Sequence, residues 1–272
     1  MTAEATAERQ FEQIETDVSS GVLRITLNRP DALNPLSVRM AGEVHAALAE
    51  AAGEAGIRAV LLTGAGRAFS SGADLSGTDA RMTDEGKPDV LTGLRETYNP
   101  MICAMRELPK PIVAAVNGPA AGIGCSLALA ADVVVAADSS YFLMAFANIG
   151  LTVDGGASAF LAARVGQARA AEMALLAERL SAQTALEWGL VNRVVASESL
   201  LDEATAVAAK LASGPTLSYA ATKSLLNSAL YPDLAAQLDR EAVAQQGCAA
   251  SEDFGIGVMA FLSKQTAEFK GA

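Results

Sequence analysis

Histidine is almost missing from this sequence, which has 272 residues and a single histidine, His45. That residue falls in the middle of a helix predicted over residues 36–53, where a lone histidine is far more often structural than catalytic. The usual base for a serine or cysteine nucleophile is therefore lacking. A zinc motif of the HExxH kind is excluded as well, because it needs two histidines.

Cysteine and basic residues are also scarce. Cys103, Cys125 and Cys248 are odd in number and far apart, without the paired spacing of a zinc site, which favours reduced thiols, no metal site and a cytoplasmic location. Twenty Lys and Arg stand against 31 Asp and Glu, for a net charge of −11. Neither nucleic acid nor an anionic membrane is therefore an expected partner, although a few local cations could bind a small anionic ligand.

Aromatic residues make up 5% of the sequence while 51% is hydrophobic, so we expect a core of Ala, Val, Leu and Ile. The length suits one large domain with a smaller appended part. The N-terminus is acidic and polar and lacks the basic start and apolar run of a secretion signal. The longest uncharged stretch, residues 111–131, is interrupted by prolines and glycines, so no membrane span is predicted.

Short apolar runs alternate with helical patterns, which predicts an α/β fold. Strands are expected at residues 22–28, 59–64, 112–118, 133–137 and 190–195, and helices at 36–53 and 124–131. From residue 167 onward the pattern is mainly helical. We therefore predict a core domain over residues 1–200, which includes a polar segment at 76–90, and a helical C-terminal region over 201–272.

The first predicted helix has a clear apolar face. Met40, Val44, Leu48 and Ala51 recur at helical spacing and are expected to be buried.

Two glycine-bearing loops each follow an apolar strand, FSSGADL at residues 69–75 and NGPAAGIGCSLALAAD at 117–132. Neither has the GxGxxG pattern of a dinucleotide site or the GxxxxGK(S/T) pattern of a phosphate loop. The second loop opens a helix whose first N–H groups lack partners and carry the positive end of the dipole. The two loops could direct two backbone donors at one oxygen, and tight turns explain the same glycines equally well.

One carboxylate, Asp154, lies between an apolar run and two glycines in NIGLTVDGGAS, residues 148–158. An aspartate before Gly-Gly is common in a turn. Apolar neighbours such as Phe142, Phe146 and Val153 would remove Asp154 from water and raise its pKa toward that of a useful base. The residues alone leave both interpretations open.

Six stretches of the chain together carry a resemblance. They are VLRITLNRPDALNPLS (22–37), GRAFSSGADLS (66–76), KPIVAAVNGPAAGIGCSLALAAD (110–132), IGLTVDGGASAFLAARVG (149–166), ALEWGLVNRVV (185–195) and FLSKQTAEF (261–269). In this order they resemble the crotonase, or enoyl-CoA hydratase/isomerase, superfamily. The resemblance implies an α/β spiral of repeated strand-strand-helix units, a helical C-terminal trimerisation region and an acyl-CoA substrate. It also implies a homotrimer or a hexamer of two trimers, with coenzyme A as part of the substrate and no separate cofactor or metal.

The resemblance also assigns an oxyanion site. In the family, two backbone N–H groups hold the thioester oxygen, and here they fall on Ala73, just after Gly72, and on Ile123, just after Gly122. One such donor typically contributes about 2.7 to 4 kcal/mol of transition-state stabilisation. These positions coincide with the two glycine-bearing loops.

Further positions are implied to bind the substrate, namely Arg29, Gly72, Asp74, Leu75, Gly122, Ser126, Phe146, Phe261 and Lys264. The coenzyme A arm would pass Arg29 and the backbone of residues 73–75, whereas Phe261 and Lys264 would reach the adenine and phosphate region of a neighbouring subunit. Arg29 fits a residue that flanks a turn as well, and Phe261 with Lys264 also fits an ordinary core ring beside a solvated charge.

The choice of reaction depends on which acids are present. Hydratases of the family use two glutamates, at the positions of Ser126 and Phe146, and both are absent, so little hydration is expected. Isomerases of the family carry an acid in a GLxPD motif, which reads GLTVD here and places the acid at Asp154, with Val153 in place of proline. Ser126 also fits an early helix residue or a lining of the acyl pocket. Asp79 and Glu96 carry no specific signal.

The resemblance thus favours an enzyme that shifts a double bond from 3-enoyl-CoA to 2-enoyl-CoA through an enolate, with Asp154 as the base. Two alternatives stay open. One is thioester hydrolysis or decarboxylation on the same scaffold, and the other is an acyl-CoA-binding protein without catalysis.

Overall fold

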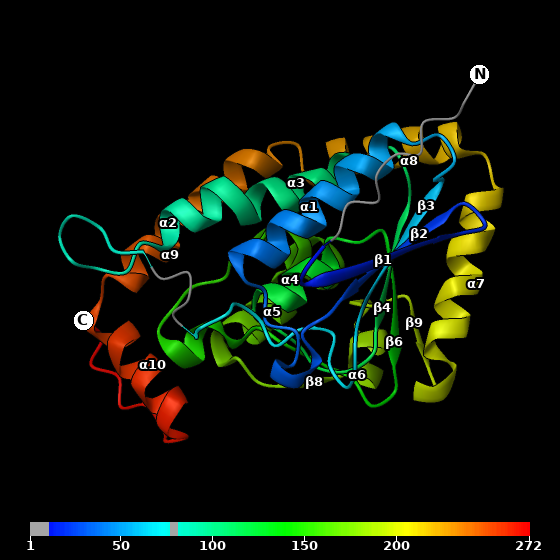
Figure 1. Ribbon diagram of the computed structural model, residues 1–272. Helices are drawn as coiled ribbons and strands as arrows, with labels where there is room; N and C mark the ends of the chain where they lie inside the picture. The colour runs from blue at the N-terminus through cyan, green and yellow to red at the C-terminus, as the bar shows by residue number, and fades with distance from the viewer. Residues whose placement is uncertain (1–10, 77–80) are drawn as a thin grey trace.

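The computed structural model describes residues 11–76 and 81–272 (Figure 1). The first ten residues and part of the predicted polar segment, including Asp79, lie outside the described residues. The strands are β1 (Ile14–Ser19), β2 (Val22–Leu27), β3 (Ala59–Gly64), β4 (Ile112–Val116), β5 (Ala120–Ala121), β6 (Val133–Ala137), β7 (Tyr141–Leu143), β8 (Leu180–Ser181) and β9 (Arg193–Val195).

Among the described residues, helices follow single strands or pairs of strands up to β9, after which four helices follow one another. They are α1 (Val38–Gly53), α2 (Val90–Gly93), α3 (Asn99–Glu107), α4 (Ile123–Leu129), α5 (Ala157–Leu176), α6 (Ala182–Glu187), α7 (Leu200–Ser213), α8 (Thr216–Leu230), α9 (Leu234–Ala249) and α10 (Glu252–Ser263). Short segments of other helix types are η1 (Pro30–Ala32), η2 (Leu94–Tyr98), η3 (Ala145–Ile149) and η4 (Ser197–Ser199).

The larger sheet has the strand order β1-β2-β3-β4-β6-β9, in which β1 is antiparallel to β2 and the other pairs are parallel. The strands predicted from apolar runs are confirmed as β2, β3, β4, β6 and β9. Every residue of β3 and β4 is buried. Continuous apolar strands of this kind are typical of a parallel sheet that is covered on both faces.

Helices cover the two faces of this sheet. On one face, α1 begins at the cap Ser37, whose side chain accepts a hydrogen bond from the N–H of Met40, and buries the predicted face of the helix. On the other face, α7 packs Leu200, Ala204 and Ala208 against the strands. Figure 1 shows α7 on one side of the strands and α1 with α3 on the other. The small residues of α7 allow this close approach.

A second, smaller sheet joins β5, β7 and β8. An isolated parallel bridge pairs Ser70 with Ala120 of β5, and a second one pairs Leu36 with Ala73. These bridges link the preceding passes of the chain to the small sheet. Successive passes of the chain therefore add a long strand to one sheet and a short one to the other before a helix follows. This arrangement is the predicted spiral of strand-strand-helix units. It also stacks the two glycine-bearing loops directly on one another.

The C-terminal helices α8, α9 and α10 follow α7. Helix α9 contacts α2 and α3, and α10 contacts η3 near the end of the molecule that carries the C-terminus (Figure 1). Helix α7 lies within the predicted C-terminal region but packs against the sheet of the core. The division of the chain at residue 200 stays a prediction. Over the ranges described, no helix is both long and apolar enough to cross a bilayer.

Candidate active site

The two glycine-bearing loops meet backbone to backbone at Gly72 and Gly122. Their φ angles are 102° and 50°, in the region that favours glycine. A Cβ atom on Gly72 would lie 3.0 Å from the carbonyl oxygen of Ala121, and one on Gly122 would lie 3.8 Å from the Cα of Gly72. Glycine therefore permits both the backbone conformation and the close approach of the loops.

The N–H groups that follow these glycines are available as donors. The N–H of Leu36 donates to the carbonyl of Gly72, and the N–H of Asp74 donates to the carbonyl of Leu36, so the N–H of Ala73 between them points away from Leu36. Ile123 is the first residue of α4. In the part of the chain that the structure describes, neither the N–H of Ala73 nor that of Ile123 has an acceptor.

Asp154 is buried, with 7% of its surface exposed. Its Oδ2 accepts a hydrogen bond of 2.8 Å from Nε2 of Gln245. Its Oδ1 is buried and has no hydrogen-bond partner among the described residues. Burial raises the pKa of Asp154 to about 7, against the lowering effect of the Gln245 hydrogen bond and with a further rise from the charge of Glu241. The carboxyl group is therefore suited to gain and lose a proton near neutral pH.

The segment of Asp154 lies against the first turn of α4. The hydroxyl of Ser126 donates a 2.8 Å hydrogen bond to the backbone oxygen of Asp154. A Cβ atom on Gly155 would lie 2.9 Å from the Cβ of Ser126 and 3.1 Å from Cγ1 of Ile123. The structure thus brings together the acid and one of the two predicted oxyanion donors. The acid also directly precedes a turn at Gly155. Asp154 is therefore both a residue beside a turn and a buried acid, so the two interpretations of this motif do not exclude each other.

Ser126 and Phe146 supply no second acid at this place. Ser126 is fully buried, and its hydroxyl proton is already directed to the carbonyl of Asp154. Phe146 is 7% exposed, and its ring atom Cζ lies 3.9 Å from the position of a Cβ on Gly122. An apolar ring beside Gly122 cannot donate or accept a proton.

Arg29 and Asp74 bind each other, and Leu75 follows them half-buried. The guanidinium of Arg29 donates to Oδ2 of Asp74 and to the carbonyl of Pro35. Burial raises the pKa of the Asp74 carboxyl, but hydrogen bonds from Arg29 and Ser76 outweigh it and hold this pKa below its ordinary value. The cation predicted to face coenzyme A therefore has an internal counter-ion.

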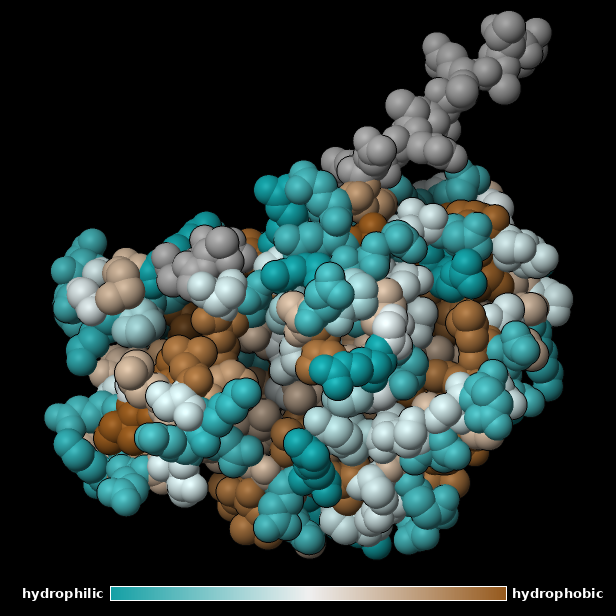
Figure 2. All heavy atoms as spheres, turned by 60° about the horizontal axis from the view of Figure 1, so that its bottom comes forward, coloured by the Kyte–Doolittle hydropathy of each residue, from teal (hydrophilic) through white to brown (hydrophobic). Residues whose placement is uncertain are grey.

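Phe261 and Lys264 lie apart from these groups, at the end of α10. Phe261 is 61% exposed, and Lys264 is the exposed C-cap of the helix, in the left-handed region at φ 55°. Figure 2 shows apolar atoms gathered at its left, over the end of the molecule that carries α10. Within one chain these two residues are not part of the group formed by Ala73, Ile123 and Asp154, so their role toward a neighbouring subunit stays a prediction.

Two residues of α9, Glu241 and Gln245, contribute to the site although the sequence did not single them out. Glu241 accepts hydrogen bonds from the N–H groups of Gly156 and Ser158 and from the Ser158 hydroxyl. No local pattern marks either residue, because each acts on a segment far away in the sequence.

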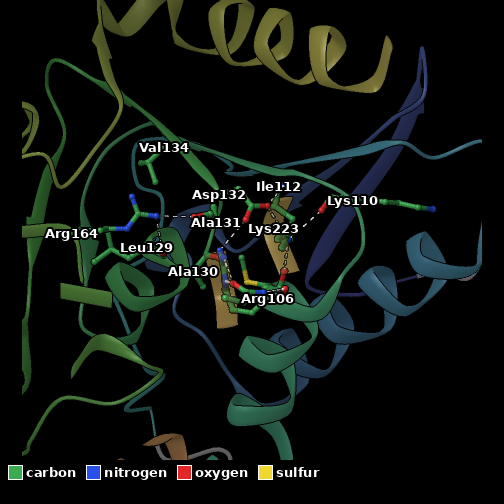
Figure 3. A network of polar contacts seen from close by, with 12 residues as sticks. Arg106, Lys110, Ile112, Leu129, Ala130, Ala131, Asp132, Val134, Arg164 and Lys223 are labelled. Atoms are coloured by element: carbon green, nitrogen blue, oxygen red, sulfur yellow. Dashed lines mark hydrogen bonds and ion pairs between the residues drawn. The ribbon is translucent and has the colours of Figure 1, made fainter. Parts of the chain in front are cut away.

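Asp132, close to the second loop, serves a different purpose (Figure 3). It accepts hydrogen bonds from the N–H of Ile112 at 2.8 Å and from Arg106 at 3.0 Å, and Lys223 lies 2.9 Å from its Oδ2. A cavity of about 710 Å³ borders Arg106, Lys223 and Tyr231 and includes none of the predicted site residues. Asp132 therefore joins α3 and α8 to the start of β4 and is structural.

Comparison with known proteins agrees with this fold. The family model described as enoyl-CoA hydratase/isomerase matches residues 17–272. Over 261 residues, 96% of this chain and 99% of the relative, the chain is 45% identical to a probable enoyl-CoA hydratase of Rhodobacter capsulatus. With the same coverage it is 41% identical to the 1,2-epoxyphenylacetyl-CoA isomerase of Escherichia coli. The crystal structure of an enoyl-CoA hydratase from Mycobacterium avium subsp. paratuberculosis superposes with a TM-score of 0.87 at 40% identity, over 96% of this chain and 100% of that one.

The fold and these similarities define an enzyme of the crotonase superfamily. Within it, the chain belongs to the enoyl-CoA hydratase/isomerase family.

Proposed function

We propose that this enzyme moves the double bond of a 3-enoyl-CoA to the 2-position. Oδ1 of Asp154 removes a proton from the carbon next to the thioester carbonyl, and the electrons of that C–H bond move into an enolate. The N–H groups of Ala73 and Ile123 donate to the enolate oxygen. The same carboxyl group then returns the proton two carbons further along, which leaves the double bond conjugated with the thioester.

The observation that carries this proposal is the buried Asp154 beside the first turn of α4, with one oxygen that has no hydrogen-bond partner in the described part of the chain. A positioned acid-base group of this kind typically contributes about 10² to 10⁴ in rate, and each oxyanion donor contributes about 2.7 to 4 kcal/mol. A hydratase must also activate water with a second acid, and Ser126 and Phe146 cannot do so. Relatives with both kinds of name match the chain, a probable hydratase of R. capsulatus and a 1,2-epoxyphenylacetyl-CoA isomerase of E. coli, so the choice of isomerase rests on the acids of the site.

Coenzyme A enters this proposal as part of the substrate, with no separate cofactor. Arg29 and the backbone of residues 73–75 would follow its pantetheine and phosphate arm. We also propose a homotrimer, in which exposed apolar residues of the C-terminal helices become buried and Phe261 with Lys264 reach the neighbouring subunit's coenzyme A. Leu217 and Leu225 of α8 and Met259 of α10 are 88%, 71% and 64% exposed in the single chain. Large exposed apolar side chains of this kind favour association. Light scattering after size exclusion distinguishes three chains, six chains and one.

The reaction is tested by incubating the purified protein with 3-enoyl-CoA and, separately, with 2-enoyl-CoA. Isomerase activity predicts conversion of the 3-enoyl to the 2-enoyl thioester and its loss in Asp154→Asn. Release of free thiol that persists in Asp154→Asn would identify a hydrolase, and rapid hydration of the 2-enoyl thioester would identify a hydratase. Binding of both thioesters without turnover would identify a non-catalytic protein.

A further inference from the structure

Gln245 of α9 holds the segment of Asp154 at two points. Its Oε1 accepts a hydrogen bond of 2.9 Å from the N–H of Thr152, and its Nε2 donates one of 2.8 Å to Oδ2 of Asp154. A backbone N–H can only donate, so the amide oxygen must face Thr152 and the amide NH₂ must face Asp154. The side chain is 2% exposed, and this orientation is therefore fixed by its surroundings.

This arrangement makes the two oxygens of Asp154 unequal. Oδ2 is held by the amide of Gln245, whereas Oδ1 is buried and has no hydrogen-bond partner among the described residues. A donated hydrogen bond stabilises negative charge on the oxygen that accepts it. A proton that arrives at this carboxylate is therefore expected on Oδ1.

We propose that Gln245 is a positioning residue for proton transfer, which fixes Oδ2 of Asp154 so that Oδ1 is the one atom that takes up and returns the proton. The substrate in this proposal rests on the proposed function, but the contact between Gln245 and Asp154 does not. Gln245 touches Asp154 and not the reacting carbons, so it acts through the acid.

Glu241, one helical turn before Gln245, fixes the other side of the same segment. Its carboxylate accepts from the N–H of Gly156 at 2.7 Å and from the N–H of Ser158 at 2.9 Å, at the start of α5. A negative charge at a helix N-terminus is favourable. The 152–158 segment is therefore fastened to α9 on both sides of the acid.

The groups that face Asp154 act on its proton in opposite directions. From α9, the Gln245 hydrogen bond lowers the pKa of Asp154 and the charge of Glu241 raises it, both against the larger rise caused by burial. From α4, the uncharged Ser126 contacts the backbone oxygen of Asp154. Removing Gln245 or Glu241 should therefore shift the titration of Asp154 in opposite directions.

The chain offers a matched control in the next residue. Gln246 also uses both ends of its amide, accepting from the N–H groups of Val90 and Leu91 and donating to the carbonyl of Pro88. It makes no hydrogen bond to Asp154. Gln245→Leu and Gln246→Leu thus remove comparable contacts of one helix, and only the first removes the contact with the acid.

The experiment titrates Asp154 directly in the full-length protein without substrate. Protein labelled with 13C at the aspartate carboxyl carbon is followed by NMR across pH 4 to 9, and the signal of Asp154 is identified by its absence in Asp154→Asn. The midpoint is expected to move to higher pH in Gln245→Leu, to lower pH in Glu241→Gln, and to stay at the wild-type value in Gln246→Leu. In the isomerase assay, Gln245→Leu should lower kcat about 10- to 100-fold with KM little changed, because a displaced catalytic group slows chemistry more than binding.

An unchanged midpoint in Gln245→Leu, or the same shift in Gln246→Leu, would overturn the proposal. The NMR titration needs no turnover, so it separates this proposal from the proposed reaction. A shift confined to Gln245→Leu supports the positioning role even if 3-enoyl-CoA proves to be the wrong substrate. An active isomerase without that shift would retain the reaction and reject the role of Gln245.

Discussion

Asp132 and Asp154 are both largely removed from solvent, and their partners differ. Asp132 lies just after the end of α4, and Asp154 lies against its first turn. Asp132 faces the cations Arg106 and Lys223 and a backbone N–H. Asp154 faces an uncharged amide on one oxygen and, among the described residues, no hydrogen-bond partner on the other. The difference teaches that burial alone does not assign a role to an acid. A carboxylate that pairs with buried cations is costly to remove, whereas a buried carboxylate without a cation has a raised pKa and can exchange a proton near neutral pH.

The largest expected effect is on catalysis by Asp154→Asn. The amide keeps the size of the side chain and cannot accept a proton, so the rate of double-bond shift should fall about 10²- to 10⁴-fold. The measurement is the ultraviolet absorbance of the conjugated thioester product. The matched variant Asp132→Asn, compared per folded molecule, should keep most of the wild-type rate. Equal losses in the two variants would remove the distinction between the two acids.

The effect of Asp132→Ala on stability should be the next largest. This change leaves Arg106 and Lys223 buried without their counter-ion, which typically costs about 3 to 5 kcal/mol. Urea unfolding followed by circular dichroism measures the free energy of unfolding. A loss below about 1 kcal/mol would mean that water or other acceptors replace the carboxylate.

The pH dependence of stability should set the two acids apart as well. The pKa of Asp154 is raised from 3.8 to about 7 in the folded protein. Between these values the folded state binds the proton and the unfolded state does not, so the contribution of Asp154 is fully present below pH 4 and is lost as pH rises through 7. The loss amounts to about 4 kcal/mol. Urea unfolding at several pH values should show this decline in the wild type and not in Asp154→Asn, and parallel curves would contradict it.

The smallest effect is expected at an exposed acid. Asp17 pairs with Arg24 across the β1-β2 hairpin, with the two side chains 56% and 39% exposed. Because such pairs are solvated, Asp17→Ala should change the free energy of unfolding by about 0 to 1 kcal/mol. The same urea titration provides this baseline for Asp132 and Asp154, and a change as large as that of Asp132→Ala would show that the strength of ion pairing does not depend on exposure here.

The sequence predicts the parts of this fold that depend on local patterns. Residues 59–64 form β3 with the predicted bounds, and Met40, Val44, Leu48 and Ala51 form the buried face of α1. The strands β5, β7 and β8 have two or three residues each and were not predicted, since their pairing comes from the stacking of the spiral.

The candidate site is only partly readable from the sequence. The sequence motifs identify Gly72, Gly122 and Asp154 as candidate site residues. Their closeness in space follows from the pairing of the small sheet. Gln245 is 91 residues away from Asp154, and no spacing rule links them. The exposed residues Phe261 and Lys264 depend on a neighbouring chain for their predicted role, which a single chain cannot reveal.

The close packing of α10 against Ile149 has a practical consequence for work with this enzyme. Gly257 lies so near Ile149 that a Cβ atom there would come within 2.5 Å of the backbone, only a few residues before the acid. A purification tag or a shortened C-terminus that displaces this helix would remove a packing contact from the segment that leads to Asp154. A truncated protein without activity would then reflect the loss of this packing contact and would not show that the proposed reaction is wrong.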